Sequence, residues 1–213
     1  VGTITGRDPL MALKEDRNIN KYKKKQVIYS EGNHPSRLFY ILKGKVKTFK
    51  SNDDGKELTI GLFNEGDFIG YVPLIQNETY KETAEALEET ELAVIPRSDF
   101  EELLNSNKEV TNKIIRLLAK NILEKENQLL GLAYNSLRKR VAEALITLMK
   151  KYKTADKEIF SIHISREDLA NIAATATESL IRTLSDFRSE KLIDIKNGDI
   201  VILNEKKLEQ MLN

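Results

Sequence analysis

Two charged side chains near the carboxyl end of the sequence have the types and the spacing needed to read DNA bases. Glu178 and Arg182 are four residues apart, which places them on one face of a helix. The guanidinium of Arg182 is a planar fork that fits O6 and N7 of guanine, and the carboxylate of Glu178 can accept from the N4 amino group of cytosine. Their neighbours Thr177 and Ser179 are further candidates for base contact.

A helix-turn-helix is the element expected to hold this pair. Ser165 with Asp168 three residues later is typical of a helix start, where the hydroxyl caps the helix and the carboxylate faces its positive end. Apolar residues then recur at helical spacing to about Ala173, and the small residues Ala174 and Thr175 predict a tight turn. Such a motif presents the front of its second helix to base edges. The alternative is an ordinary helical hairpin. The second helix is expected to bury Leu180, Leu184 and Phe187.

The residues on either side predict the rest of a winged domain. Asn197-Gly198 is a type I′ turn signal between Leu192–Lys196 and Asp199–Leu203, so these two runs predict a β-hairpin, the wing. The other elements expected in this part are a hinge at Tyr134–Ser136, a helix over 137–148, a polar linker at Lys150–Lys157 and a last helix at Lys206–Leu212.

A coiled-coil seam is predicted in the long helical stretch before this domain. Apolar residues alternate there at spacings of three and four, the pattern of paired helices. Lys125 interrupts the pattern without an evident reason. Because a two-fold DNA reader needs a dimer, we expect the seam to pair two copies of the chain; the alternative is a helix packed on its own domain. The expected interface residues are Ile115, Leu118, Ile122, Leu129 and Leu132.

Short β-like runs separated by glycines fill the chain from Val27 to Pro96. Asn52–Gly55 is a hairpin signal, and many short strands at this spacing are typical of a sandwich or roll. A basic lead-in at Lys21–Gln26 precedes them, and helices are expected from Pro9 and from Ser98 to about Leu104. The expected strands are 27–29, 38–42, 46–49, 58–63, 68–69, 84–87 and 92–95.

The helix-turn-helix residues resemble those of the CRP/FNR transcription regulators. The matching runs are Ile164–Ala170 and Glu178–Arg182, in which the spacing Glu-x-x-x-Arg is the specific part. Ala174 departs from the family, which usually places glycine in the turn. The β region resembles the same family and, more broadly, cyclic-nucleotide-binding β-rolls. The matching runs there are Tyr29–Gly32, Phe39–Val46, Glu65–Gly70, Ala84–Leu87 and Glu91–Pro96.

This resemblance covers the chain from about residue 22 and implies an α+β fold in three parts. These are a β-roll sensor of the double-stranded jelly-roll type over 1–106, a dimerisation helix over 107–134 and a winged helix-turn-helix over 135–213. The implied partners are double-stranded DNA, a second copy of the chain and RNA polymerase. A β-roll regulatory or scaffolding module without DNA binding is the alternative.

The resemblance also implies a G·C pair read in each half of a palindrome, with further side chains on the phosphates. The full set expected to contact DNA is Arg138, Lys139, Arg140, Ser165, Arg166, Thr175, Thr177, Glu178, Ser179 and Arg182. Arg138–Arg140 with Lys150, Lys151 and Lys153 is the densest basic cluster of the chain. A solvated helix face explains it as well as phosphate contact does.

The effector pocket is where the sequence departs most from the resemblance. Family members that bind cyclic AMP hold its ribose with a Gly-Glu-Leu run, its phosphate with an arginine before a small hydroxyl residue and alanine, and its base with hydroxyls of the long helix. The corresponding residues are Gly70-Tyr71-Val72, Glu82-Thr83-Ala84, and Lys125 with Glu126. A glutamate repels phosphate, and adjacent Lys81 offers a point charge in place of a fork. We therefore expect the chain to have the fold of the family but not to bind cyclic AMP. We expect its effector to be another molecule, whose identity the sequence does not indicate.

Composition excludes several functions. Lys and Arg number 34 against 33 Asp and Glu, so no strong overall field attracts nucleic acid. The sequence has no cysteine, which excludes disulfides, thiolate metal sites and iron–sulfur clusters. No apolar run approaches a membrane span and no secretory signal opens the sequence, so we expect a cytoplasmic protein.

The two histidines, His34 and His163, decide against an enzyme. Metal-dependent oxygenases built on similar β-rolls need several histidines with a carboxylate around one metal, and these two fall in different expected domains. We therefore expect no enzyme activity, no metal and no cofactor. A haem sensor that uses His34 is the remaining alternative.

Overall fold

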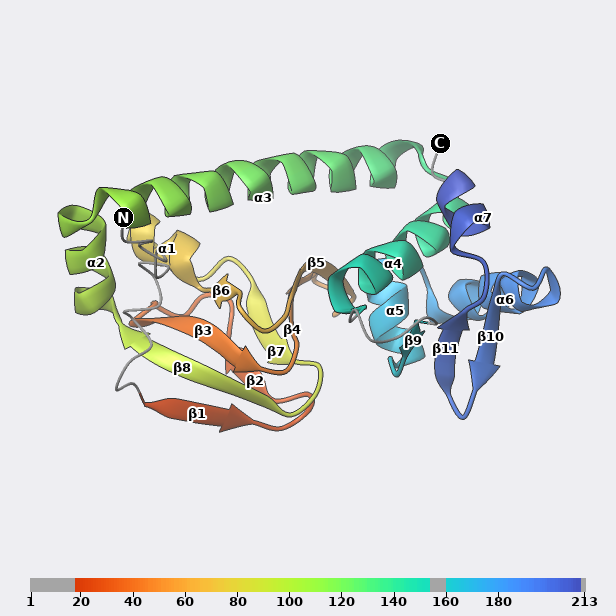
Figure 1. Cartoon of the computed structure of the whole chain (residues 1–213), viewed down its shortest axis with the longest axis horizontal. Helices are drawn as coiled ribbons and strands as arrows, with labels where there is room; N and C mark the ends of the chain where they lie inside the picture. Colours follow the sequence, from red (N-terminus) through yellow and green to blue (C-terminus); the bar gives the residue numbers. More distant parts are fainter. Residues whose placement is uncertain (1–17, 154–159, 212–213) are drawn as a thin grey trace, which may run out of the picture. The chain divides into compact units, whose positions relative to one another are not determined.

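Glycine turns and apolar runs divide the first half of the chain into short antiparallel strands (Figure 1). The structure is a computed structural model that describes residues 18–153 and 160–211. One sheet has the order β1-β8-β3-β6 and the other β2-β7-β4-β5. The strands are β1 (Ile19–Tyr22), β2 (Val27–Tyr29), β3 (Arg37–Lys43), β4 (Val46–Ser51), β5 (Glu57–Phe63), β6 (Phe68–Ile69), β7 (Thr83–Ala86) and β8 (Thr90–Pro96).

Strand β3 is apolar at almost every position because both of its faces are buried. Leu38 and Tyr40 point to one side, where they pack with helix residues such as Phe100 and Val110. The alternate residues of β3 point to the other side, against Val46 and Ala84 of the second sheet. A continuous apolar run in place of strict alternation is what a strand covered on both faces requires. The core of the roll therefore has two layers, with this strand between them.

Three helices complete the first half: α1 (Tyr71–Gln76), α2 (Arg97–Ser106) and α3 (Lys108–Tyr134). The 27 residues of α3 make a helix about 40 Å long. Val110 and Ile114 in its first turns are buried in the core of the roll. In the described part of the chain, no helix is both long enough and apolar enough to cross a membrane.

The second half folds into helices around a small sheet with the order β10-β11-β9. Its core is built from residues such as Leu145, Leu169, Leu184 and Phe187, all of them buried. The elements are α4 (Leu137–Tyr152), β9 (Ser161–Ile162), α5 (Arg166–Ile172), α6 (Thr177–Ser189), β10 (Ile193–Lys196), β11 (Asp199–Ile202) and α7 (Glu205–Gln210).

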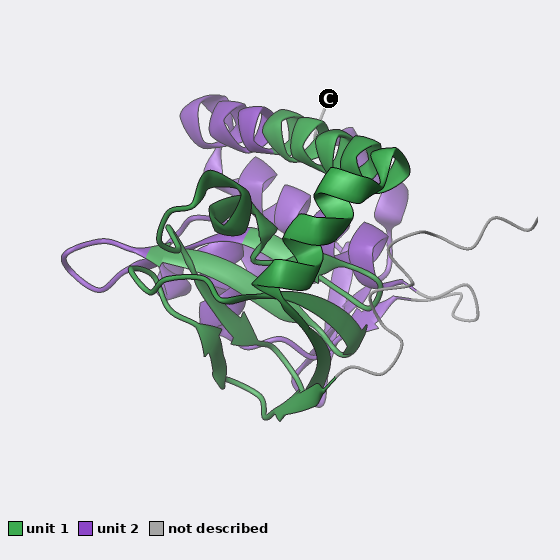
Figure 2. Ribbon diagram, turned by 90° about the vertical axis from the view of Figure 1, so that its left-hand side faces the viewer, with its two compact units in different colours: residues 1–50, 61–124 green, residues 51–60, 125–213 purple. Residues whose placement is uncertain are grey.

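The chain divides into two compact units, which Figure 2 shows in different colours. One comprises residues 1–50 and 61–124 and the other 51–60 and 125–213. This division differs from the three segments expected from the sequence. Helix α3 is shared between the units at residue 124, and the tip of the β4–β5 hairpin belongs with the DNA-binding residues.

Within the second unit, side chains hold this hairpin tip. The Lys125 ammonium donates to the carbonyl of Ile60. Gln128 Nε2 donates to the Thr59 carbonyl at 3.1 Å, and Asn171 Nδ2 of α5 lies 3.4 Å from Glu57 Oε2. These contacts explain the lysine that interrupts the predicted seam, because its ammonium has a partner within its own chain.

Two segments differ from the sequence expectations. The basic lead-in at Lys21–Gln26 begins inside a strand, because β1 pairs with β8 from Ile19↔Ala93 to Tyr22↔Thr90. The polar linker was expected to begin at Lys150, but Lys150 and Lys151 belong to α4, which ends at Tyr152. Lys150 pairs at 2.9 Å with Glu209 of α7, on the exposed side of an otherwise buried helix. The helix expected from Pro9 lies outside the described residues.

Candidate nucleic-acid interface

The helix-turn-helix begins at a hydroxyl cap, as its sequence predicts. Ser165 Oγ accepts from the Asp168 backbone N–H at 3.0 Å and donates to the Asp168 carboxylate at 2.6 Å. Ala174 in the turn has φ of 51°, in the left-handed region, where an alanine is strained and a glycine is not. The Thr175 N–H donates to the carbonyl of Ala170 at 3.0 Å and closes the turn. Helix α6 starts two residues later.

Helix α6 has one fully buried face and one exposed face. Leu180, Leu184 and Phe187 are buried as expected, with Thr183 beside them. The exposed residues are Glu178, Ile181, Arg182, Ser185, Asp186, Arg188 and Ser189. Within the described residues, the side chains of Glu178 and Arg182 make no hydrogen bond or ion pair with each other or with a third group. Both side chains are therefore available for contacts outside the folded chain.

The other expected base readers lie at the edge of this face. Thr177 and Ser179 are half-buried, and so is Thr175 in the turn. The Ser179 carbonyl accepts from the Thr183 hydroxyl at 3.0 Å, a contact inside the helix. In the first two turns of α6 the exposed charges thus come from Glu178 and Arg182, and smaller polar residues flank them. Asp186 and Arg188 are exposed nearer the carboxyl end of the helix.

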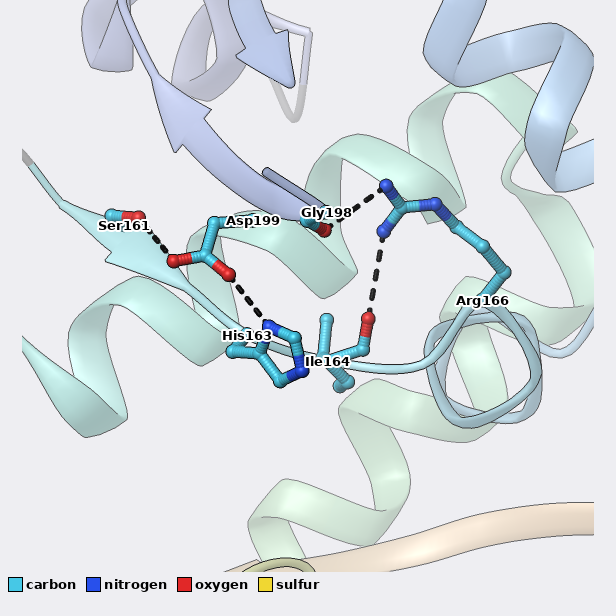
Figure 3. Close-up of polar contacts among 6 residues, drawn as sticks. All are labelled: Ser161, His163, Ile164, Arg166, Gly198 and Asp199. Carbon is cyan, nitrogen blue, oxygen red and sulfur yellow. Dashed lines mark hydrogen bonds and ion pairs between the residues drawn. The ribbon is translucent and has the colours of Figure 1, made fainter. Parts of the chain in front are cut away.

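The wing is tied to the start of α5 by a cluster of polar contacts (Figure 3). Its turn residues Asn197 and Gly198 have φ of 52° and 89°, the pair of positive values that a type I′ turn needs. Asp199 Oδ1 lies 2.6 Å from His163 Nδ1, and its Oδ2 is 3.5 Å from Ser161 Oγ. Ser161 and His163 both contact the carboxylate of Asp199. In a Ser-His-Asp triad the imidazole lies between the serine and the carboxylate, so the arrangement here is not such a triad.

Arg166, which is expected to hold a phosphate, contacts two backbone carbonyls of its own domain. Its Nη2 donates to the Gly198 carbonyl at 3.3 Å and its Nη1 is 3.5 Å from the Ile164 carbonyl (Figure 3). The guanidinium predicted to hold a phosphate is therefore engaged with the wing turn and with the segment before α5. In this structure it positions the wing.

One arginine of the basic cluster at the start of α4 is likewise engaged with its own chain. The Arg138 guanidinium lies 4.7 Å from the centre of the Phe187 ring and pairs with Glu190, so it joins α4 to α6. Nε of Arg140 is buried. Lys139 follows the cap residue Ser136, whose hydroxyl accepts from its backbone N–H at 3.3 Å. Within the described residues, the side chains of Lys139 and Arg140 make no hydrogen bond, ion pair or ring contact, and only Arg138 of the three is engaged in this way.

The residues expected around an effector are packed with tyrosines in the first unit. The rings of Tyr29 and Tyr80 stack with their centres 3.9 Å apart, and the Tyr29 hydroxyl donates to Glu82 Oε1 at 3.3 Å. Burial, with the Glu82 carboxylate as a second cause, raises the pKa of Tyr29 well above its ordinary value. Burial also raises the pKa of Tyr80 to about 12. Thr83 Oγ1 accepts from the Glu31 N–H at 3.1 Å, and Ala84 is fully buried.

Next to this cluster, Tyr71 connects the roll to α3. Its hydroxyl accepts a hydrogen bond from Asn121 Nδ2, and its side chain is buried, which raises its pKa. Gly70 before it has φ of 82°, and the Tyr80 hydroxyl would lie 3.4 Å from an added Cβ. Val72 is exposed. Lys125 and Glu126, the last two residues expected around an effector, belong to the second unit.

The exposed apolar residues of α3 follow a heptad spacing that differs in part from the predicted seam. Ile115, Ile122 and Leu129 expose 56%, 59% and 65% of their surface. Leu118, also expected at the dimer interface, is half-buried and packs against the core of its own roll. Leu132 is half-buried. Leu123 and Leu130, which the sequence analysis did not include, are exposed beside the stripe.

Sequence reasoning missed three residues of this interface. Ile181 carried a usable signal, because it is an apolar residue that falls off the face of Leu180, Leu184 and Phe187. His163 and Asp199 carried none, since 36 residues separate them and the turn that brings them together lies beside Gly198.

A winged helix-turn-helix whose second helix exposes a Glu-x-x-x-Arg pair, in one chain with an antiparallel β-roll and a long helix, defines a class of DNA-binding regulators. Two family models match the chain: the cyclic nucleotide-binding domain over residues 19–107 and the Crp-like helix-turn-helix domain over residues 139–211. The chain belongs to the CRP/FNR family of transcription regulators.

Relatives of known identity agree with this assignment. The chain is 25% identical over 188 residues to the transcriptional activator protein anr of Pseudomonas aeruginosa, covering 87% of this chain and 77% of that one. It is 27% identical to the cyclic AMP receptor protein of Thermus thermophilus, covering 89% and 86%. Among solved structures, FixK2 of Bradyrhizobium japonicum has the same fold, with a TM-score of 0.80 at 21% identity, covering 92% and 96%.

Proposed function

We propose that this transcription regulator works as a homodimer that reads a palindromic DNA site through α6. The observation that carries the proposal is the exposed face of α6, where Glu178 and Arg182 reach outward without a partner among the described residues. A guanidinium and a carboxylate at this spacing can contact the two bases of one G·C pair. The buried face of the same helix fixes its orientation.

The exposed heptad of α3 supports the homodimer. Ile115, Ile122 and Leu129 are seven residues apart and each exposes more than half of its surface, which is costly on a helix that faces water. A second copy of the same helix would cover them by coiled-coil packing. Two-fold symmetry then requires two half-sites about one helical turn apart.

The packing around Glu82 supports an effector other than cyclic AMP or cyclic GMP. A phosphate there would meet a carboxylate that already accepts from the Tyr29 hydroxyl, and like charges repel strongly where water is excluded. The stacked rings of Tyr29 and Tyr80 occupy the same region. A regulator of this kind is expected to work in the cytoplasm, to meet RNA polymerase at promoters and to carry out no chemical reaction of its own.

Selection from a random DNA pool tests the proposal. The full chain, immobilised without nucleic acid, is expected to enrich a palindrome with a G·C pair at the same position in both halves. Binding of that duplex should exceed binding of a scrambled one by about a thousandfold or more at physiological salt. Equal, weak retention of all sequences on a filter would favour the scaffolding module instead.

A further inference from the structure

An isoleucine stands in the middle of the polar face of α6. Ile181 exposes 50% of its surface, while the apolar residues on either side of it in the helix, Leu180 and Leu184, are buried. The packing of the domain therefore does not explain its type. Helix propensity does not explain it either, because a β-branched residue is a weaker helix former than Lys, Glu or Gln. Its exposed side chain is therefore available for an apolar contact outside the folded chain.

Its position places it among the base-reading side chains. Ile181 is three residues after Glu178 and directly before Arg182, and all three are exposed. Residues three apart are neighbours on a helix surface, so a base next to the one that Glu178 contacts is within reach of Ile181. A β-branched side chain in a helix is held in one dominant rotamer. The residue thus presents a fixed apolar shape and loses little entropy on contact.

Base edges in the major groove carry one apolar group, the 5-methyl group of thymine. We infer that Ile181 is a specificity-determining residue that packs against the methyl group of a thymine next to the base pair read by Glu178 and Arg182. The inference rests on the proposed reading of DNA by α6. It adds a second kind of recognition to that helix, because methyl contact depends on shape where the charged pair depends on hydrogen bonds.

Replacement of thymine by uracil tests the inference, because it removes the methyl group and keeps the hydrogen-bonding edge. The probe is the duplex that the wild-type chain selects from a random pool, with each thymine replaced in turn, symmetrically in both half-sites. At one thymine position, the replacement is expected to weaken binding about fourfold per half-site, which is the equivalent of one buried methyl group. Replacement in both half-sites should weaken binding about fifteenfold. Fluorescence anisotropy gives the dissociation constants.

The variant Ile181→Ala should lose this sensitivity, so that thymine and uracil duplexes bind within about twofold of each other. Ile181→Val, which keeps the β-branch, should retain part of it. Arg182→Ala is the matched control: it should bind more weakly overall and keep the uracil penalty. Thermal unfolding of each variant, compared with wild type, shows that the helix is intact.

Two results would overturn the inference, and they differ in kind. A selected duplex without a methyl-dependent thymine, or one whose uracil penalty is unchanged in Ile181→Ala, would show that Ile181 does not read the methyl group while DNA reading by α6 stands. Failure to select any duplex would remove the proposed DNA reading, and the inference with it.

Discussion

Nδ1 of His163 lies 2.6 Å from Oδ1 of Asp199, and this contact joins the segment before α5 to the first residue of a wing strand. Arg166, two residues after Ile164 in the chain, donates from its guanidinium to the neighbouring carbonyl of Gly198. The wing turn is therefore attached twice to the motif that reads DNA. Both attachments lie outside the hydrophobic core, so they can be changed without unfolding the domain.

Asp199→Ala should loosen the wing and weaken DNA binding on preferred and random duplexes alike, by about 1 kcal/mol, the usual contribution of one hydrogen bond. Because the pair is largely exposed, the midpoint of thermal unfolding should change little. Removal of a carboxylate also favours DNA binding electrostatically, so Glu209→Ala, which removes the partner of Lys150, is the matched control. Anisotropy titrations in which the two variants bind equally well would contradict the role of the wing contact.

Arg182→Ala should cost roughly 1–3 kcal/mol on the selected duplex and flatten the preference at the contacted guanine. Lys139→Ala should weaken all sequences alike and reduce the salt dependence by about one phosphate contact. Titrations at several salt concentrations with a specific and a random duplex separate the two effects. Equal losses on both duplexes for Arg182→Ala would mean that its guanidinium contacts phosphate only.

Leu129→Glu should give a monomer, because it places a charge in the exposed apolar stripe of α3. Leu118→Glu should act differently and lower the stability of the roll, since Leu118 packs against that core. Sedimentation velocity at micromolar concentration and thermal unfolding measure the two outcomes. A wild-type chain that sediments as a monomer would refute the pairing of this helix.

Cyclic AMP and cyclic GMP should give no saturable heat with the wild-type chain at concentrations up to about 1 mM, which corresponds to binding weaker than about −4 kcal/mol. The reason is the Glu82 carboxylate, which accepts from the Tyr29 hydroxyl beside the stacked Tyr80 ring. Isothermal titration calorimetry measures the heat of nucleotide binding. A micromolar, saturable site for either nucleotide would show that this region does hold a phosphate.

Ala174→Gly should stabilise the DNA-binding domain by about 0.5–1 kcal/mol. Relief of the left-handed strain at φ of 51° exceeds the entropy that a glycine adds to the unfolded chain. The neighbouring change Ala173→Gly is the control: Ala173 is buried with φ of −79°, so glycine there should destabilise by about 1 kcal/mol. Urea unfolding of the two variants should therefore move in opposite directions.

Local patterns predicted most of the fold, and long-range contacts account for what they did not predict. The glycine turns and the apolar run of β3 are visible in sequence because each depends on neighbouring residues. Strand β1 was missed because its residues Asn20 and Lys21 are polar, as is common at the edge of a sheet. Its pairing with β8 joins residues about seventy apart in the chain.

The same distinction applies to the site. Glu178 and Arg182 were found because their spacing along one helix carries the information. The partners of Arg166, Arg138 and Lys125 lie 32, 52 and 65 residues away, and nothing in the local sequence indicates them. A basic residue predicted to contact phosphate or to line a pocket can for this reason be engaged with its own chain.

The placement of the hairpin tip matters for anyone who builds hybrid regulators from this chain. A graft that transfers residues 135–213 to a foreign sensor would carry Asn171 without the Glu57 carboxylate that its amide meets. It would also leave Gln128 and its Thr59 carbonyl behind on the discarded part. A chimera that brings residues 51–60 and 125–134 with the reader should therefore keep a native surface on α5 that the shorter graft loses.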